Sequence, residues 1–218
     1  GYEFDKMRKR IMRHLNQRSE MLSGISHDLR TPLTRIKLQL SFIKDKEIEK
    51  KLSDDVIEME KMLNEYLQFA KNRSNEKNEN FDIVNLVYET IKKYENKNIN
   101  FLQKSKILFS GRKNLIRRCL NNFIDNSLKY GDKINIDLKK TANNIVILID
   151  DNGPGIPQKE YENVFKPFYK IDKSRGDAKS SVGLGMSIAS DIIQSHGGSI
   201  KLESSPHKGL RVKIFLPF

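Results

Sequence analysis

The sequence has one cysteine, Cys119, and no tryptophan among its 218 residues. A single cysteine excludes an intramolecular disulfide and a zinc site built from cysteines, which is typical of proteins of a reducing cytosol. No apolar run approaches the roughly 18 residues that cross a bilayer. The charged opening GYEFDKMRKRIMRHL does not resemble a signal peptide. We therefore expect these residues to lie in the cytoplasm.

Basic residues outnumber acidic ones, with 40 lysines and arginines against 28 aspartates and glutamates and a formal net charge of +12. Nucleic-acid binding is one explanation. Coding bias is the other, because the excess is mostly lysine and accompanies many asparagines and isoleucines, as in YENKNINF. The sequence shows no recognition-helix motif or set of stacking aromatics, so we expect no nucleic-acid partner. The charge would still attract an anionic ligand or an acidic protein.

The first third of the chain, residues 3–70, has helical periodicity. Its apolar residues form two series, separated by the polar stretch KDKEIEK (residues 44–50), which can turn the chain. Alternating steps of three and four are typical of bundle packing. Two helices bury little alone, so we expect dimerisation into a four-helix bundle. The first series is Leu22, Ile25, Leu29, Leu33, Ile36, Leu40 and Ile43, and the second is Leu52, Val56, Met59, Leu63, Tyr66 and Ala70.

Residues 71–80, KNRSNEKNEN, contain no apolar residue and predict a linker. After it, FDIVNLVYETIKKY predicts a helix with Asp82 as its N-cap. INIDLKK, NIVILID, SIKLESS and LRVKIFLPF predict strands. KEYENVFKPF predicts a short helix, and LGMSIASDIIQSHGG predicts a helix ended by glycine. Over residues 81–218 this mixture predicts an α+β sandwich of one sheet against a helical layer.

The stretch SHDLRTPL, residues 26–33, places a histidine, an acid and a proline in the first helical series. His27 falls between two seam positions, so it points away from the bundle core, and Thr31 shares its face one turn later. A neutral imidazole is a good nucleophile near neutral pH, and Asp28 beside it could act as a base. Pro32 frees the Asp28 carbonyl and permits a bend. A surface histidine near a tolerated proline is the alternative.

NNFIDNSLKY, residues 121–130, predicts a helix with one polar face. Asn122 and Asn126 are four residues apart and share that face. Their carboxamide oxygens are hard neutral ligands that suit Mg²⁺ beside phosphates and waters. Lys129 could approach a phosphate as a point charge, and Tyr130 could pack beside a base or a sugar. An ordinary polar helix in an asparagine-rich protein is the alternative.

DDNGPGIP, residues 150–157, follows directly after the apolar run NIVILI. Asp151 could accept a hydrogen bond from the exocyclic amine of adenine. Gly153 and Gly155 would let the backbone approach a ligand closely. A simple turn explains the same residues without any ligand.

VGLGMSIASDII, residues 182–193, carries Gly183 and Gly185 into the start of a helix. The free N–H groups and the dipole at such a helix start suit an anion. The stretch matches neither the Walker A loop nor the dinucleotide fingerprint G-x-G-x-x-G, so its signal is weak when taken alone.

Taken together and in this order, these stretches resemble the sensor histidine kinases of two-component systems, and they are most similar to the EnvZ-type osmosensor kinases. HDLRTPLTRI resembles the H box, NNFIDNSLKY the N box, DNGPGI the G1 box, FKPFY the F box and VGLGM the G2 box. FDKMRKRI resembles the end of a HAMP signalling helix. The resemblance covers nearly the whole chain and implies the cytoplasmic portion of a bacterial inner-membrane sensor.

The resemblance implies an α+β fold with two domains. A helical hairpin, dimerised as a four-helix bundle, precedes an α/β-sandwich ATP-binding domain of the Bergerat (GHKL) type. Residues 1–20 would be the end of the signalling helix and residues 21–70 the dimerisation and histidine-phosphotransfer (DHp) domain. Residues 71–80 would be the linker and residues 81–218 the catalytic ATP-binding domain.

The resemblance also implies roles in phosphoryl transfer. His27 would attack the γ-phosphorus of ATP and carry the phosphoryl group, with Asp28 as the base. An aspartate of a cognate response regulator would then receive the group, and Thr31 would support dephosphorylation of that regulator. Catalysis of this kind is mostly positioning and charge neutralisation. The implied partners are therefore a second copy of the chain and the regulator.

The implied cofactors are ATP and Mg²⁺. Asn126 would ligate Mg²⁺ with Asn122 nearby, and Asp151 would bind the adenine amine. Residues 168–181 would form the ATP lid. The other nucleotide-binding residues implied by the resemblance are Lys129, Tyr130, Gly153, Gly155, Phe168, Gly183, Leu184 and Gly185.

Two positions depart from the family pattern. Ser181 stands where the lid commonly ends in the first glycine of G-x-G-x-G, and Ser127 stands where alanine is usual. A GHKL-type ATPase without phosphotransfer, as in gyrase, chaperone or MutL-like clamps, is the alternative that the asparagine and D-x-G-x-G motifs alone would allow. The H box and the hairpin argue against it, because such clamps need no phosphorylatable helix.

Overall fold

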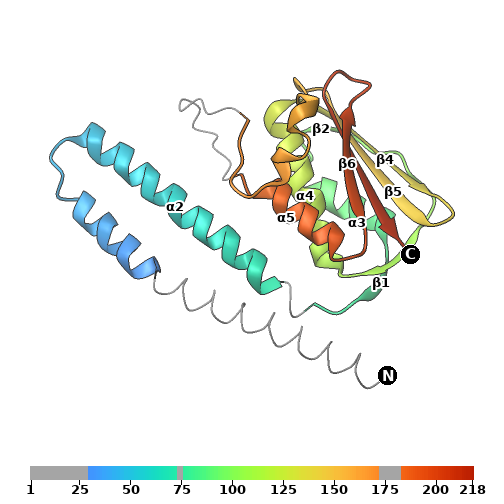
Figure 1. Ribbon diagram of the computed structural model, residues 1–218, viewed down its shortest axis with the longest axis horizontal. Coiled ribbons are helices and arrows are strands. Elements are labelled where there is room, and N and C mark those ends of the chain that lie inside the picture. Colours follow the sequence, from blue (N-terminus) through green and yellow to red (C-terminus); the bar gives the residue numbers. More distant parts are fainter. Residues whose placement is uncertain (1–28, 73–75, 172–182) are drawn as a thin grey trace. The chain divides into compact units, whose positions relative to one another are not determined.

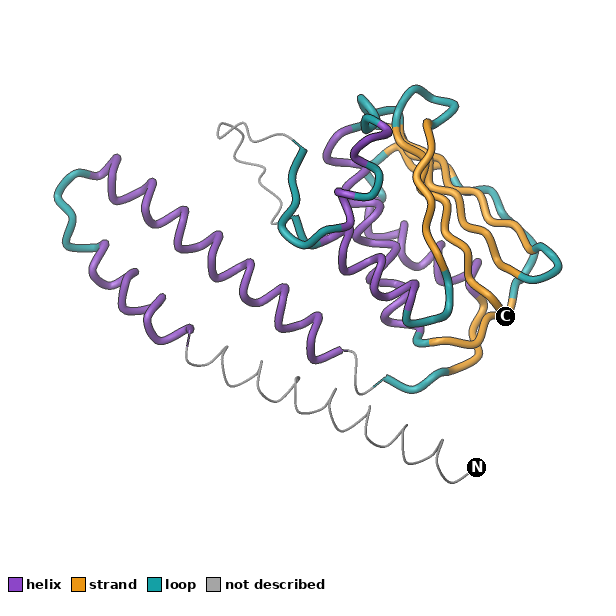
Figure 2. Tube along the Cα trace, viewed as in Figure 1, coloured by secondary structure: helices purple, strands orange, loops and turns teal. Residues whose placement is uncertain are grey.

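The computed structural model describes residues 29–72, 76–171 and 183–218 of the chain. It divides into two compact units, residues 1–76 and residues 77–218. The described part of the first unit is helical, and the second unit holds all of the described strands (Figures 1 and 2). None of the helices in these described ranges is long and apolar enough to cross a membrane.

The N-terminal unit contains an antiparallel hairpin of helical residues 29–40 and α2 (Lys46–Asn72). Asp45 caps α2, because its carboxylate accepts the N–H groups of Glu47 at 3.0 Å and of Ile48 at 3.2 Å. The helix therefore begins inside the stretch 44–50 that the sequence assigned to the turn. That assignment was too long, because a capping aspartate lets the charged residues after it join the helix.

The two helices of the hairpin pack through a small apolar cluster. Leu33, Leu40 and Val56 are buried in it, and Ile43 and Leu63 are packed against it. Polar contacts flank the cluster. The Lys37 ammonium donates to Glu60 at 2.5 Å, and Arg30 donates to Asn64 at 2.8 Å.

The apolar series of the hairpin divides into a buried half and an exposed half. Alternate seam positions of both helices stay open to solvent in the single hairpin. The exposed members are Leu29, Ile36, Leu52 and Met59, with 39–51% of each residue accessible. One hairpin therefore covers only part of its own apolar surface.

The C-terminal unit is a mixed five-stranded sheet with one helical layer against it, as the sequence predicted (Figures 1 and 2). The strand order is β2-β4-β5-β7-β6, in which only the β2–β4 pair is parallel. A separate two-stranded sheet pairs β1 with β3. The strands are β1 (Glu79–Asp82), β2 (Asn98–Asn100), β3 (Leu108–Gly111), β4 (Lys133–Lys140), β5 (Asn144–Asp151), β6 (Ser199–Ser204) and β7 (Leu210–Pro217); the helices are α3 (Ile83–Ile91), η1 (Lys92–Tyr94), α4 (Lys113–Tyr130), η2 (Gln158–Glu160), η3 (Asn163–Phe165) and α5 (Gly185–Gln194).

The core of the described part of this unit lies between the sheet and helices α3, α4 and α5. Side chains alternate between the two faces of a strand, so every second residue along most of β4 and β7 is buried, whereas the central strand β5 has buried residues on both faces. Helix α3 begins with Asp82 as its N-cap, whose carboxylate accepts the Val84 N–H at 3.1 Å, as predicted. The sheet face and the helices meet through Ile134, Ile136, Leu138, Ile145, Ile147, Ile149, Val212, Ile214, Leu216, Leu86, Ile116, Phe123 and Ile188.

The short helix that the sequence predicts around residues 159–168 is 3₁₀ rather than α-helical. It consists of two separate turns, η2 and η3. Proline at position 167 disfavours helical backbone at the residue before it. The Glu160 carboxylate also accepts a hydrogen bond from Asn163 at 3.1 Å, and such local side-chain bonds compete with an α-helical ladder.

Helix α5 ends in glycine, as predicted. Gly197 adopts a φ of 74°, its N–H donates to the Gln194 carbonyl, and the Gly198 N–H donates to the Ile193 carbonyl, which together form a Schellman motif. His196 in this turn accepts the Arg112 N–H on Nε2 at 3.1 Å, and its Nδ1 lies 2.7 Å from the Ile192 carbonyl. The end of α5 is thereby tied to the start of α4.

Replacing Ile147 with alanine tests the central position of β5. Ile147 is 1% exposed, so we expect Ile147→Ala to lower the free energy of unfolding of the C-terminal unit by about 2–5 kcal/mol. Urea unfolding followed by circular dichroism measures the change. Leu102→Ala is the control, because Leu102 is 79% exposed. A loss of similar size in both variants would contradict the assigned core.

Candidate functional site

The Asp151 carboxylate is buried at the end of β5, on the helix-facing side of the sheet. It is only 4% exposed. Its Oδ1 accepts the backbone N–H groups of Gly153 and Leu210, each at 2.9 Å. Because both bonds end on Oδ1, Oδ2 keeps its lone pairs for a further donor. The carboxylate is thus held in one orientation and can accept a hydrogen bond from a ligand.

The turn after β5 is joined to the end of α4. The Asn152 carboxamide oxygen accepts the N–H groups of Asp132 and Lys133 at 3.0 Å, and its NH₂ donates to the Asp132 carboxylate at 2.7 Å. A Cβ on Gly153 would lie 3.0 Å from the Tyr130 carbonyl oxygen. The structure therefore brings the predicted Asp151–Gly153 stretch against the predicted asparagine helix. Asn152 makes this connection, although no pattern in the sequence distinguishes it from the residues around it.

Asn122 is a residue of α4 whose side chain lies beside the start of α5. Its Nδ2 is buried and has no hydrogen-bond partner among the described residues. A Cβ on Gly185 would lie 3.9 Å from the Asn122 carboxamide oxygen, so the side chain is next to the first residue of α5. An unpaired buried donor costs about 1–3 kcal/mol. A ligand oxygen at this helix start would satisfy it, and the backbone N–H groups of α5 would favour an anionic one.

The second half of α4 carries the remaining polar residues of the asparagine helix. Asn126 is half-buried, one turn after Asn122. Tyr130 is 53% exposed, and the Lys129 ammonium lies 5.1 Å from the centre of its ring. The described ranges contain no group of three or more histidine, cysteine, aspartate or glutamate side chains that could hold a metal ion. A carboxamide such as Asn126 fits Mg²⁺, which takes few protein ligands and fills its shell with phosphates and waters.

Phe168 and Gly183 meet through their backbones. The Phe168 N–H donates to the Gly183 carbonyl at 3.0 Å. Gly183 has a φ of 79°, and Phe168 has a φ of 63°, which is uncommon for a residue with a side chain. A Cβ on Gly183 would come within 3.0 Å of the Phe168 backbone, so glycine is required there. Leu184, which follows, is 3% exposed and stands at the N-cap position of α5.

The structure brings several of the predicted site residues of the C-terminal unit into contact: Gly153 with Tyr130, Gly185 with Asn122, and Phe168 with Gly183. Gly155 has a φ of 74° and lies next to Gly209. A Cβ placed on Gly155 would lie 3.4 Å from the Gly209 carbonyl oxygen. The residues of the predicted H box belong to the other unit. Thr31 is exposed on helical residues 29–40, while His27 and Asp28 lie outside the described residues.

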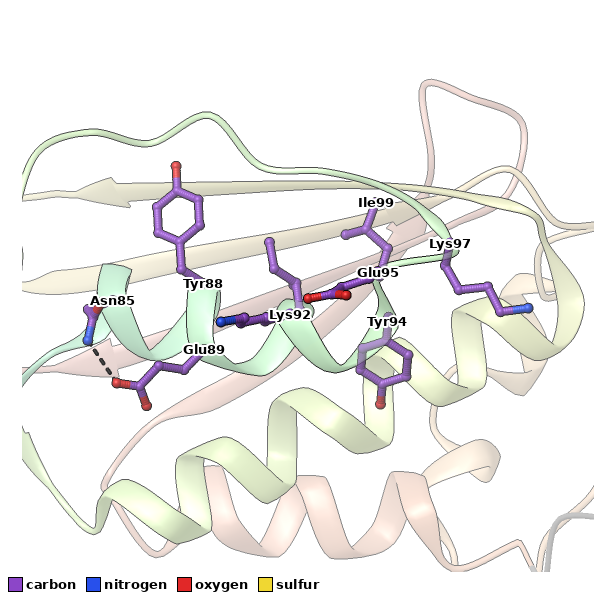
Figure 3. A pocket seen from close by; sticks show the side chains of 9 residues that line it. Asn85, Tyr88, Glu89, Lys92, Tyr94, Glu95, Lys97 and Ile99 are labelled. Carbon is purple, nitrogen blue, oxygen red and sulfur yellow. Dashed lines mark hydrogen bonds between the residues drawn. The ribbon is translucent and has the colours of Figure 1, made fainter.

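Tyr94 contacts α4 through Asn121 and Asp125. Its hydroxyl donates to Asp125 at 2.7 Å and lies 3.1 Å from Asn121. Burial, followed by the bond to Asp125, raises the pKa of Tyr94, so the phenol remains a neutral donor at physiological pH. Tyr94 also lines an open hollow of about 460 Å³ on α3, η1 and β2, together with Tyr88, Lys92 and Ile99 (Figure 3). The predicted nucleotide-binding residues do not line this hollow.

Two family models match the chain. The His Kinase A (phospho-acceptor) domain matches residues 17–75, and the histidine kinase-, DNA gyrase B- and HSP90-like ATPase matches residues 111–218. Sensor histidine kinase GtrS of Pseudomonas aeruginosa is 33% identical over 216 residues, which cover 98% of this chain and 45% of GtrS. Sensor histidine kinase CpxA of Escherichia coli is 31% identical over 233 residues, covering 100% of this chain and 50% of CpxA. The chain therefore spans about half the length of the curated relatives it matches.

A solved structure supports the fold of the C-terminal unit. The crystal structure of the ATP binding domain of PrrB from Mycobacterium tuberculosis superposes with a TM-score of 0.55 at 24% identity. The match covers 65% of this chain and 97% of that one. This likeness concerns the sheet and its helices rather than any particular side chain.

Tyr169→Phe tests how the segment before Phe168 is held. The Tyr169 hydroxyl donates to Glu160 at 2.5 Å, and this bond, followed by the one from Asn163, holds the pKa of Glu160 below its ordinary value. A lowered carboxyl pKa stabilises the fold above the ordinary value, and that stabilisation is lost as pH falls through the lowered one. We expect Tyr169→Phe to raise the Glu160 pKa, measured by carbon-13 NMR titration of the carboxyl group.

Tyr161→Phe is the matched control for this titration. Tyr161 stands next to Glu160 in the sequence but does not donate to it. The Glu160 pKa should therefore stay low in Tyr161→Phe. An unchanged Glu160 pKa in Tyr169→Phe would contradict the assigned bond.

Proposed function

Because the chain belongs to the sensor histidine kinases of two-component systems, we propose that it uses ATP to phosphorylate His27 and passes the phosphoryl group to an aspartate of a cognate response regulator. The observation that carries this proposal is the contact between the asparagine helix, the Asp151 turn and the start of α5. These elements leave one buried acceptor and one buried donor, at Asp151 and Asn122, for a ligand.

The nucleotide would lie along these elements. Asp151 Oδ2 would accept the adenine amine, and the Nδ2 of Asn122 would donate to a phosphate oxygen beside the start of α5. Lys129 would neutralise phosphate charge, and Tyr130 would lie beside the base or the sugar. Asn126 would ligate Mg²⁺, which supplies charge neutralisation between the phosphates. Gly153, Gly155, Phe168, Gly183, Leu184 and Gly185 would shape the pocket wall.

The transfer step uses the first unit. A nitrogen of the His27 imidazole forms a bond to the γ-phosphorus while the bond from that phosphorus to the bridging oxygen breaks, so ADP leaves. Asp28 takes the imidazole proton. The regulator's aspartate then forms its bond to phosphorus as the nitrogen–phosphorus bond breaks. Thr31 is exposed and lies four residues after His27. It would support the separate reaction in which the regulator is dephosphorylated.

We also propose that the hairpin dimerises into a four-helix bundle. The support is the exposed half of the apolar series, Leu29 and Ile36 on one helix and Leu52 and Met59 on α2. A second hairpin would remove these side chains from water, at about 25 cal/mol for each Å² of apolar surface buried. The full-length protein would be membrane-anchored, with this chain as its cytoplasmic portion, as the HAMP-like stretch FDKMRKRI suggests.

The phosphorylated residue is tested by His27→Ala. We expect the variant to incorporate no phosphate from γ-labelled ATP, because the accepting nitrogen is gone, while its affinity for Mg–ADP stays that of the parent chain. His14→Ala is the control, since it removes the other histidine of the N-terminal region. Labelled phosphate on His27→Ala would refute the assignment. ATP hydrolysis without a phosphorylated protein, in the parent chain, would favour the GHKL-type ATPase instead.

The proposed phosphatase role is tested by Thr31→Ala. We expect the rate of regulator dephosphorylation to fall far more than the rate of autophosphorylation, because Thr31 does not bond to the transferred phosphorus. Both rates are measured with labelled phosphate and a purified receiver domain. Thr34→Ala provides the control, as Thr34 is also exposed on helical residues 29–40. Equal losses of the two activities in Thr31→Ala would exclude a selective role.

A further inference from the structure

Two neighbouring carboxylates end β5, and they face opposite sides of the sheet. Asp151 is on the helix-facing side, where its Oδ1 accepts the Leu210 N–H at 2.9 Å. Asp150 is on the other side, where it accepts Nε and Nη2 of Arg211 at 2.7 Å and 2.8 Å. Consecutive residues of β7 therefore hold consecutive carboxylates of β5. Each contact fixes the same end of the β5–β7 pair from a different face.

The residue before this pair is crowded against Asp151. A Cβ on Gly209 would lie 2.1 Å from Asp151 Oδ1, 2.4 Å from the Asp151 carbonyl oxygen and 2.6 Å from the Gly153 nitrogen. Side-chain carbons do not approach oxygen this closely, so any other residue would force β7 away from β5. Glycine at this position is what lets the Leu210 N–H reach the carboxylate.

The Asp150–Arg211 pair is largely shielded from water. The Asp150 side chain is 9% exposed and that of Arg211 is 24% exposed. A bidentate guanidinium fixes both the distance and the orientation of its carboxylate. Removing the guanidinium would leave the Asp150 carboxylate buried without its counter-charge, which is strongly unfavourable. We expect the strands to separate locally so that water can reach the carboxylate. Opening at Asp150 would move the backbone that carries Asp151.

We propose that Gly209 and Arg211 are positioning residues that set the selectivity of the nucleotide site for adenine, acting through Asp151. This inference rests on the proposed function. Because Oδ1 already accepts two backbone N–H groups, Oδ2 is the oxygen left to accept a hydrogen bond from the ligand. The 6-amino group of adenine can donate to it, whereas the 6-oxo group of hypoxanthine would place one acceptor against another. Selectivity therefore depends on a carboxylate that cannot turn or withdraw.

The test compares the affinities of Mg–ADP and Mg–IDP, the inosine analogue, by calorimetry on the full chain. We expect the parent chain to bind ADP at least about 100-fold more tightly than IDP, because a site built around a hydrogen bond rejects the analogue that lacks it. We expect Gly209→Ala and Arg211→Met each to reduce this ratio about tenfold, mainly through weaker ADP binding. Thermal unfolding of each variant sets a temperature at which all are folded.

Two controls separate positioning from general damage to the sheet. Gly198→Ala introduces an equally crowded Cβ, which would lie 2.2 Å from the Phe215 carbonyl oxygen. Phe215 lies opposite Val146, five residues before Asp151 on β5, so this crowding is at the other end of the strand pair. Lys213→Met removes a charge from the face of β7 that also carries Arg211. The Lys213 ammonium lies 3.8 Å from the Glu203 carboxylate. Both controls should keep the ADP-to-IDP ratio of the parent chain even where they lower the melting temperature.

The outcomes are distinct. An unchanged ratio in folded Gly209→Ala and Arg211→Met overturns the inference, and so does an equal fall in the controls. If Gly209→Ala does not fold, Arg211→Met and Arg211→Lys decide the question, because lysine keeps the charge but loses the bidentate contact and should give an intermediate ratio. A parent chain that binds ADP and IDP equally refutes the proposed role of Asp151 itself, whereas a selective parent with unaffected variants refutes only the positioning.

Discussion

A single buried carboxylate, that of Asp151, is the constraint on which the C-terminal unit's site depends. It ends a central strand, accepts two backbone N–H groups, and lies where β7, the turn after β5 and the end of α4 meet. Removing a carboxylate from water is costly, so it persists there only because donors surround one of its oxygens. One donor, the Leu210 N–H, is placed by the β5–β7 register, in which Asp150 lies opposite Arg211, and the other, the Gly153 N–H, comes from the turn after β5. The packing of the sheet and the chemistry of the site are therefore one problem.

Much of this fold could be predicted because its elements carry their own patterns. In strands β4, β5, β6 and β7, apolar residues either alternate with polar ones or form a continuous run. The start of α3 is marked by Asp82, a residue type typical of N-caps. The strands β1, β2 and β3 could not be found this way, because each has only three or four residues and is stabilised by its partner rather than by its own periodicity. The short helix expected around residues 159–168 could be predicted, but its 3₁₀ form could not, because it depends on side-chain bonds at Glu160 that compete with an α-helical ladder.

The site shows the same division between side chains and backbone. Asp151 and the asparagines of α4 could be singled out because their side chains are chemically suited to nucleotide and Mg²⁺. The Leu210 N–H could not be, since any residue but proline carries the same donor and only the register of β7 brings it to Asp151. The hairpin gives a comparable lesson. The spacing of its apolar series indicates which residues share a face but not which of them one hairpin buries, and the structure places Leu33 and Val56 inside and leaves Leu29 and Met59 exposed.

The Asn152–Gly153 dipeptide also bears on the chemical lifetime of the protein. Asparagine followed by glycine is the sequence in which the next backbone nitrogen most readily attacks the side-chain amide and releases ammonia, and asparagine is among the thermolabile residues. In the folded chain that nitrogen donates its hydrogen to Asp151, and the Asn152 carboxamide is held by Asp132 and Lys133. Folding thus protects this dipeptide from ageing. Deamidation of the unfolded chain would convert residue 152 into an aspartate. The refolded chain would then place two carboxylates, at 132 and 152, where the Asn152 amide now donates to Asp132 and joins the turn to α4.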